Sequence, residues 1–184
     1  MKISELKISL FIFAFIFGIG WNGLSFAASK IEIDARVKVT LEKFYKEVGA
    51  GKELAKRASG ILVFPSVIKA GIGIGGEYGE GALRINGRTV EYYNTAAASI
   101  GFQLGAQSKS IIILFMTKDT LSNFRNSEGW EVGVDGSVAL VKIGAGGSVD
   151  TTNIKDPIIG FVFGQKGLMY NLTLEGSKIT RIKK

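Results

Sequence analysis

The chain has 184 residues, with 23 Lys plus Arg against 16 Asp plus Glu, and it contains neither cysteine nor histidine. These absences exclude disulfides, nucleophilic sites of the Cys–His or Ser–His–Asp type, and zinc sites with nitrogen or sulfur ligands. The formal charge of +7 favours anionic lipid, anionic polysaccharide or another protein over nucleic acid as a partner, and a merely solvated basic surface is the alternative.

Residues 1–27 have the pattern of a secretory signal. Two lysines precede an uncharged apolar stretch from Ile8 to Gly20, and Ser25-Phe26-Ala27 offers small residues to a signal peptidase. Cleavage near Ala27 predicts an exported protein, periplasmic or secreted, with residues 28–184 forming a single domain. An uncleaved membrane anchor is the alternative, although the apolar stretch is short for a span of about 20 residues.

Residues 28–59 form the predicted helical part of this domain. Apolar residues recur at spacings of three and four, as one face of a helix requires, at Ile33, Val37, Leu41, Phe44 and Val48. The segment Gly49-Ala50-Gly51 ends this helix, and a second short helix is predicted at 52–58. We expect the apolar face to pack on the protein's own sheet; a basic amphipathic helix lying on a membrane is the alternative.

Residues 60–184 read mainly as strands. Asn86-Gly87 between two apolar runs predicts a two-residue hairpin, and Pro65 predicts a turn. Thr117 is a suitable cap for a helix at 118–125. Further strands are predicted at 100–107, 110–116, 131–143, 158–163, 168–174 and 178–182. The fold class is therefore α+β, with N-terminal amphipathic helices packed on a glycine-rich, mostly antiparallel, curved or barrel-like sheet.

A track of alternating glycines follows the first strand. Alternate residues of a strand share a face, so Gly71, Gly73 and Gly75 leave one face bare. Glycine in a strand weakens it, so this pattern predicts a close approach by another backbone, a helix or a flat ligand.

Several catalytic and ligand motifs are matched only in part. The glycine track fits G-x-G-x-x-G, but a dinucleotide site needs a helix there and a hairpin follows instead. Ser66 and Lys69 fit S-x-x-K without the third element of a serine penicillin-binding enzyme. Pairs of carboxylates read as polar surface, namely Glu77 with Glu80 and Glu128 with Glu131. Asp150 and Asp156 flank a loop with oxygen ligands but without the EF-hand pattern. No catalytic residue, metal site or cofactor is predicted.

Four ordered blocks of the sequence resemble the SYLF domain family. They are Ala58–Gly81; Ala98–Ser108, similar to a G-x-Q-x-G-A-Q-S segment; Glu131–Ala139; and Gly167–Ile179. Gly136 stands where alanine is more common in the family. Together the blocks cover nearly all of residues 28–184.

The resemblance implies a lipid-binding module without enzymatic activity, of the bacterial exported type. Eukaryotic members are associated with phosphoinositide membranes and in some cases with actin; an exported protein is not expected to meet actin. We expect recognition of anionic phospholipid or a membrane surface, with an envelope protein–protein interaction or structural module as the alternative and a small hydrolase as a lesser one. The candidate lipid-binding residues are Lys52, Lys56, Arg57, Lys69, Gly71, Gly73 and Gly75.

Overall fold

The computed structural model describes residues 28–141, 155–166 and 174–184, without the side-chain surroundings of 72–73 and 99–106. The elements follow in the order α2 (Lys30–Glu47), α3 (Gly51–Arg57), β1 (Gly60–Ile85), β2 (Arg88–Phe115), α4 (Lys118–Asn126), β3 (Trp130–Glu131), β4 (Ala139–Val141), β5 (Ile158–Lys166) and β6 (Lys178–Ile182). The predicted strand at 168–174 lies almost wholly outside the described residues, as does Asp150.

Two very long strands form the centre of the molecule. β1 has 26 residues and β2 has 28, and they pair along their whole length into one antiparallel ribbon. Asn86 and Gly87 both have positive φ, 51° and 77°, which confirms the predicted hairpin turn because the type I′ turn requires this conformation at both positions.

The prediction of many short strands was wrong for this ribbon. The pairing register shifts between Phe64 and Val67 and between Ile72 and Ile74. A shift of this kind bends a strand without ending it. Pro65 lies at the first shift, inside β1, so the predicted proline turn is also wrong.

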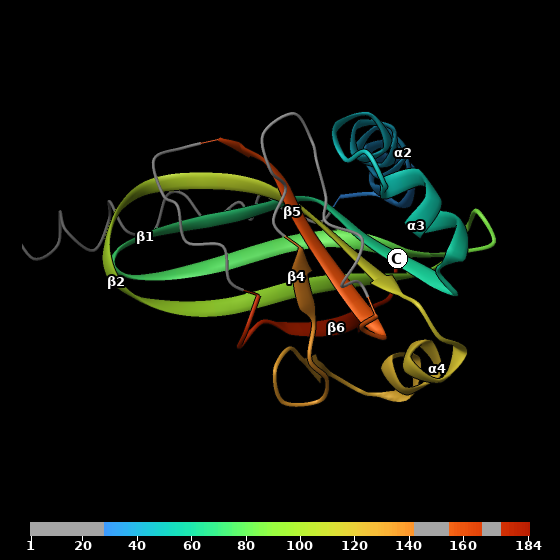
Figure 1. The fold of residues 1–184 in the computed structure, drawn as a ribbon. Helices are drawn as coiled ribbons and strands as arrows, with labels where there is room; N and C mark the ends of the chain where they lie inside the picture. Colours follow the sequence, from blue (N-terminus) through green and yellow to red (C-terminus); the bar gives the residue numbers. More distant parts are fainter. Residues whose placement is uncertain (1–27, 142–154, 167–173) are drawn as a thin grey trace, which may run out of the picture.

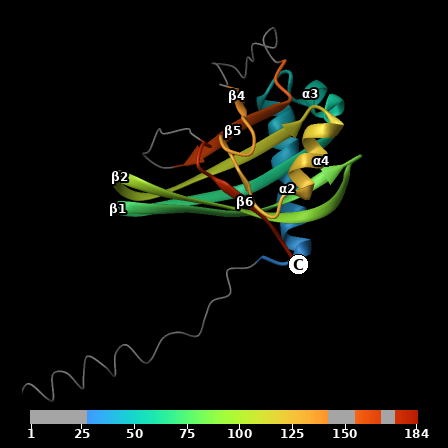
Figure 2. The same cartoon turned by 90° about the horizontal axis from the view of Figure 1, so that it is seen from below.

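The sheet is mostly antiparallel and strongly curled, so the α+β prediction is confirmed. Its strands are hydrogen-bonded in the order β3-β6-β2-β5-β4, and β1 pairs with β2 in addition to this order. β4 pairs with β5 in parallel. Figure 1 shows the β1–β2 ribbon curving over at its far end. In Figure 2 the helices gather at one end of the sheet, and the ribbon projects beyond them at the other.

Two apolar cores lie on opposite faces of this sheet. The outer core joins α2 and α3 to the sheet, and the inner core joins α4 and Trp130 to the inside of the curl. The five predicted residues of the α2 stripe are all buried in the outer core: Ile33, Val37, Leu41, Phe44 and Val48. The helix therefore packs on its own sheet, as the periodicity predicted.

The short elements follow their local sequence signals. The Ser29 side chain accepts a hydrogen bond from the Glu32 amide at the start of α2, and Thr117 accepts one from Thr120 at the start of α4. The predicted strand at 131–143 is instead divided into β3 and β4, because the chain turns at Gly133 with a φ of 92°. No helix within the described residues is long and apolar enough to cross a membrane.

Candidate functional site

A basic cavity of about 410 Å³ lies between α2, α3 and the β1–β2 hairpin turn. Its cationic side chains come from three separate elements: Lys38 from α2, Lys56 from α3 and Arg84 from β1. Glu42 is the acidic residue in its lining, and apolar groups complete the wall with Leu41, Tyr45, Ala55 and Ile61. A cavity with excess positive charge and an apolar wall suits a ligand that is anionic at one end and apolar at the other.

The charged groups around this cavity are exposed, except for Arg84, which is half-buried. The Lys56 Nζ lies 2.8 Å from the Glu53 carboxylate in an exposed pair, and this lysine lowers the Glu53 pKa by hydrogen bonding and by its charge. Burial raises the pKa of Tyr45, and the positive charge of Arg84 opposes that shift. The Arg84 guanidinium also donates to the Gly87 carbonyl in the hairpin turn, which holds it at the cavity mouth.

Only part of the predicted lipid-binding set lies at this cavity. Lys52, Lys56 and Arg57 are all exposed on α3, and Lys56 lines the cavity itself. Lys69, the fourth cation of the predicted set, does not line this cavity. It is 6% exposed, and it lies nine positions along β1 from Gly60, a distance of roughly 25–30 Å.

The glycine track lies where the ribbon curves over. A Cβ at Gly71 would meet the Gly75 backbone at 2.3 Å, so the chain approaches itself there. The side-chain surroundings of Gly73 lie outside the described residues. A close approach to a more distant part of the backbone occurs further along β1, at Gly81. A Cβ at Gly81 would lie 2.1 Å from the carbonyl oxygen of Val63, near the start of the same strand.

A second, more apolar groove of about 800 Å³ runs between the start of α2 and the outer face of β1. Ile68 and Tyr78 line it and are exposed, and Ile74, between them on the same face of β1, is exposed as well. Glu77 also lines this groove. The outer face of the ribbon therefore presents an apolar strip, defined by Ile68, Ile74 and Tyr78, beyond the end of α2.

The catalytic alternatives have no assembled geometry among the described residues. The Ser66 hydroxyl lies 3.4 Å from the Ser108 hydroxyl, and the Lys69 ammonium lies 3.5 Å from Glu77 instead. Glu80 accepts hydrogen bonds from Tyr78 and Lys184. Glu77 and Glu80 each bind cations, so they are not arranged as an acid–base pair.

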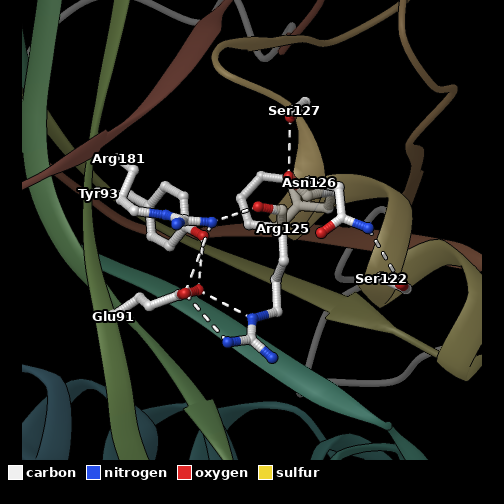
Figure 3. A network of polar contacts seen from close by, with 8 residues as sticks. Glu91, Tyr93, Ser122, Arg125, Asn126, Ser127 and Arg181 are labelled. Atoms are coloured by element: carbon white, nitrogen blue, oxygen red, sulfur yellow. Dashed lines mark hydrogen bonds and ion pairs between the residues drawn. The ribbon is translucent and has the colours of Figure 1, made fainter.

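A polar network on the other side of the sheet has a structural role. Figure 3 shows the Glu91 carboxylate of β2 facing Arg125 of α4 and Arg181 of β6. Arg125 donates two hydrogen bonds of 3.0 Å to it, and the Tyr93 hydroxyl donates one of 2.8 Å. Burial alone would raise the Glu91 pKa, but hydrogen bonds from Arg125 and Tyr93 and the arginine charges lower it overall. Burial and Glu91 raise the pKa of Tyr93 to about 12.

Sequence reasoning missed Lys38 and Arg84. Lys38, Glu42 and Tyr45 lie at helical spacing, which places them on one side of α2. No local signal shows that α3 and the hairpin turn meet that side, because this depends on how the sheet packs against the helices.

Comparison with known proteins finds a family match in the second half of the chain. Residues 96–184 match the model of the family described as Ysc84, Las17-binding protein actin regulator. The blocks at 98–108, 131–139 and 167–179 lie inside this match, and the block at 58–81 precedes it. No curated protein matches the chain.

Proposed function

The chain carries a domain of the Ysc84 (SYLF) family over residues 96–184, and from this premise we propose that it is a non-catalytic module that binds anionic membrane surfaces. The observation that carries this proposal is the basic cavity, where Lys38, Lys56 and Arg84 converge beside an apolar wall. Lys52 and Arg57 add positive charge on the exposed face of α3.

The physical basis is electrostatic attraction joined to shallow apolar contact. A lysine or arginine close to an anionic membrane contributes about 1 kcal/mol of binding free energy. The five cations at this end of the molecule therefore strengthen binding to an anionic membrane together. The cavity offers room for a phosphate-bearing head group, and its wall offers contact for the adjoining glycerol and acyl carbons.

The test is co-sedimentation of the full chain with vesicles of phosphatidylcholine alone or with phosphatidylglycerol, across a salt series. We expect adsorption to the anionic vesicles that weakens as salt rises. The double variant Lys56→Glu, Arg84→Glu should reduce adsorption at least tenfold, because each reversal removes one attraction and adds one repulsion.

Lys118→Glu, on the exposed surface of α4, is the control; it makes the same charge change as Lys56→Glu alone, so these two single variants are also compared directly. All variants keep residues 1–27, so any adsorption by that segment is common to them. Equal adsorption by the cavity double variant and the control would overturn the assignment to this cavity.

We also propose export with cleavage before Ala28. In support, the Ala28 backbone nitrogen lies 3.0 Å from the Glu80 carboxylate. Cleavage at this bond would turn that nitrogen into a charged ammonium already beside a carboxylate. Mass spectrometry of the N-terminus of the protein recovered from expressing cells tests this; an intact Met1 would contradict it.

A second candidate function is protein binding, favoured by the exposed apolar strip of β1. Ile68, Ile74 and Tyr78 lie along one face of an outer strand, and the family description names binding to a protein. An Ile74→Ser variant that abolishes self-association or partner capture while vesicle adsorption is unchanged would favour this function over lipid binding.

A further inference from the structure

Four polar side chains are buried together inside the curve of the β1–β2 ribbon. Lys69 is 6% exposed, Lys109 is 2% exposed and Gln107 is 3% exposed. The Glu77 carboxylate lies 3.5 Å from the Lys69 Nζ and 2.8 Å from the Lys109 Nζ. We call these four residues the ribbon cluster.

The pairing of the strands explains why these side chains meet. Lys69 on β1 is directly opposite Gln107 on β2, and Lys109 follows two residues later, opposite Val67. Directly paired residues and alternate residues of a strand share a face. Val67 belongs to the inner core, so Lys69, Gln107 and Lys109 all lie on the inner face. Glu77 comes from the part of β1 beyond the bend, so the curve of the ribbon brings it back onto the lysines.

The ribbon cluster has more positive charge and more donors than its acceptor can satisfy. Among the described residues, Glu77 is the one carboxylate within ion-pair distance of either ammonium. The Gln107 Nε2 is buried and has no hydrogen-bond partner in the part of the chain that the structure describes. The neighbouring segment 99–106 contains no acidic residue.

An imbalance of this kind is costly unless something compensates for it. A buried charge without a partner and a buried amide without an acceptor both destabilise the folded state. Ammonium and amide groups donate hydrogen bonds, and a lysine has no acceptor. The missing partner is therefore an acceptor with negative charge, which excludes a metal cation and favours an oxyanion.

We propose that the ribbon cluster is a binding site for a phosphate group, held by Lys69, Lys109 and the amide of Gln107. Glu77 fixes the two ammonium groups and leaves one positive charge for the ligand. Charge-assisted hydrogen bonds to phosphate are about twice as strong as neutral ones. The side chains of Lys69 and Glu77 are 8% and 11% exposed, so this edge of the ribbon cluster reaches solvent.

This site is distinct from the basic cavity and does not depend on the proposed function. The cavity lies at the Gly60 end of β1, whereas the ribbon cluster lies near the bend. The phosphate can be a free ion or part of a lipid head group, since the recognised chemistry is the same. Two experiments separate these sources.

The first experiment is calorimetric titration of the full chain with inorganic phosphate, at an ionic strength held constant with sodium chloride. We expect saturable binding with a stoichiometry near one. Lys109→Met should weaken the affinity at least about tenfold, and Lys118→Met, on the exposed surface of α4, should leave it unchanged. Lack of saturable binding by the wild type, or unchanged affinity in Lys109→Met, would overturn the proposal.

Gln107→Leu keeps the proposal testable if Lys109→Met fails to fold. Removing an amide that lacks a partner should leave the melting temperature equal or higher without phosphate, yet phosphate affinity should fall several-fold. A Gln107→Leu protein that is folded and binds phosphate as tightly as the wild type would contradict the role given to this amide.

The second experiment identifies the source of the phosphate. Adsorption of the full chain to vesicles of phosphatidylcholine with phosphatidic acid is measured with and without saturating inorganic phosphate. Competition, together with weaker adsorption of Lys109→Met, supports a lipid-borne phosphate at the ribbon cluster. Saturable phosphate binding without competition supports a free ion. The membrane proposal is tested by vesicle adsorption of the double variant Lys56→Glu, Arg84→Glu, and the phosphate proposal by titration of Lys109→Met. Because the two tests use different variants, failure of one proposal is distinguishable from failure of the other.

Discussion

Single glycines of β1 have different roles although they share one pattern. Gly81 lies where the strand passes close to its own earlier residues, and an added Cβ would meet the Val63 carbonyl at 2.1 Å and Phe64 at 2.7 Å. At Gly76 the nearest atom would be the Ala97 carbonyl oxygen at 3.7 Å, an ordinary contact. The sequence alone does not distinguish these two positions.

We therefore predict that Gly81→Ala lowers the free energy of unfolding by about 1–3 kcal/mol, the usual cost of forcing extra volume into a packed site. Gly76→Ala should change it by less than about 0.5 kcal/mol. Urea unfolding followed by circular dichroism measures both. Similar values for the two variants would mean that close approach of backbone does not explain the glycine at 81.

At the level of elements, Glu91 connects three parts of the fold that lie far apart in the sequence. It is on β2, Arg125 is at the end of α4, and Arg181 is on β6, with 3.5 Å between the Arg181 guanidinium and the carboxylate. Arg181 also donates to the Arg125 carbonyl. α4 also packs on the sheet through Leu121 and Phe124, so the carboxylate adds a polar link beside this apolar contact.

Glu91→Gln should lower the free energy of unfolding at pH 7 by about 1–2 kcal/mol, the value for a charged hydrogen bond reduced because Arg125 is partly exposed. The folded-state pKa of Glu91 lies below its ordinary value of 4.5. The carboxylate therefore stabilises the fold above about pH 4.5, and this contribution is lost as pH falls through the lower folded-state pKa.

Urea unfolding at pH 7, 5 and 3 checks this prediction. The wild type should lose more stability than Glu91→Gln between pH 5 and pH 3. Glu32→Gln, which removes the exposed carboxylate partner of Arg36, serves as the control and should follow the wild type. A constant difference between wild type and Glu91→Gln at all three pH values would contradict the titration argument.

At the level of the whole molecule, the two ends of the described chain meet at one carboxylate. The Lys184 Nζ lies 2.9 Å from both the Glu80 carboxylate and the Ala28 carbonyl, and the Ala28 nitrogen donates to the same carboxylate. The side chains of Lys184 and Glu80 are each about nine-tenths buried. Glu80 thus joins the segment just before α2, the last part of β1 and Lys184.

We predict that Glu80→Gln lowers the free energy of unfolding by about 1.5–3 kcal/mol. The loss should be larger in protein cleaved before Ala28, because the new ammonium group would then lack its carboxylate. Glu32→Gln, which breaks an exposed pair with Arg36, should change stability by less than about 1 kcal/mol. Thermal unfolding of the protein with a defined N-terminus tests this, and equal effects of the two variants would refute it.

The local features of the fold follow closely from the sequence. The apolar face of α2, the cap at Thr117, and the turn at Asn86-Gly87 each depend on residues only a few positions apart. The continuity of β1 and β2 could not be predicted in the same way. Glycines and a proline normally signal a break in a strand, and here pairing with a partner of similar length keeps the ribbon continuous through them.

The candidate lipid-binding residues also differ in whether their exposure could be predicted from neighbouring residues. Lys52, Lys56 and Arg57 were predicted from a local run of charge, and exposure on a short helix follows from that run. Lys69 has the same chemistry in sequence but is buried, because the face it occupies is decided by the register with Gln107 and by the bend that brings Glu77 to it.

The sequence by itself determined the helical face that packs on the sheet, the hairpin, the absence of cysteine and histidine chemistry, and the family resemblance. The tertiary structure decided which lysines are exposed, which glycines are essential, and which elements line the basic cavity. The physical reason is the distance along the sequence over which each effect acts. Periodicity, capping and turn preferences act over a few residues, whereas burial and charge pairing depend on residues that only the curled sheet brings together.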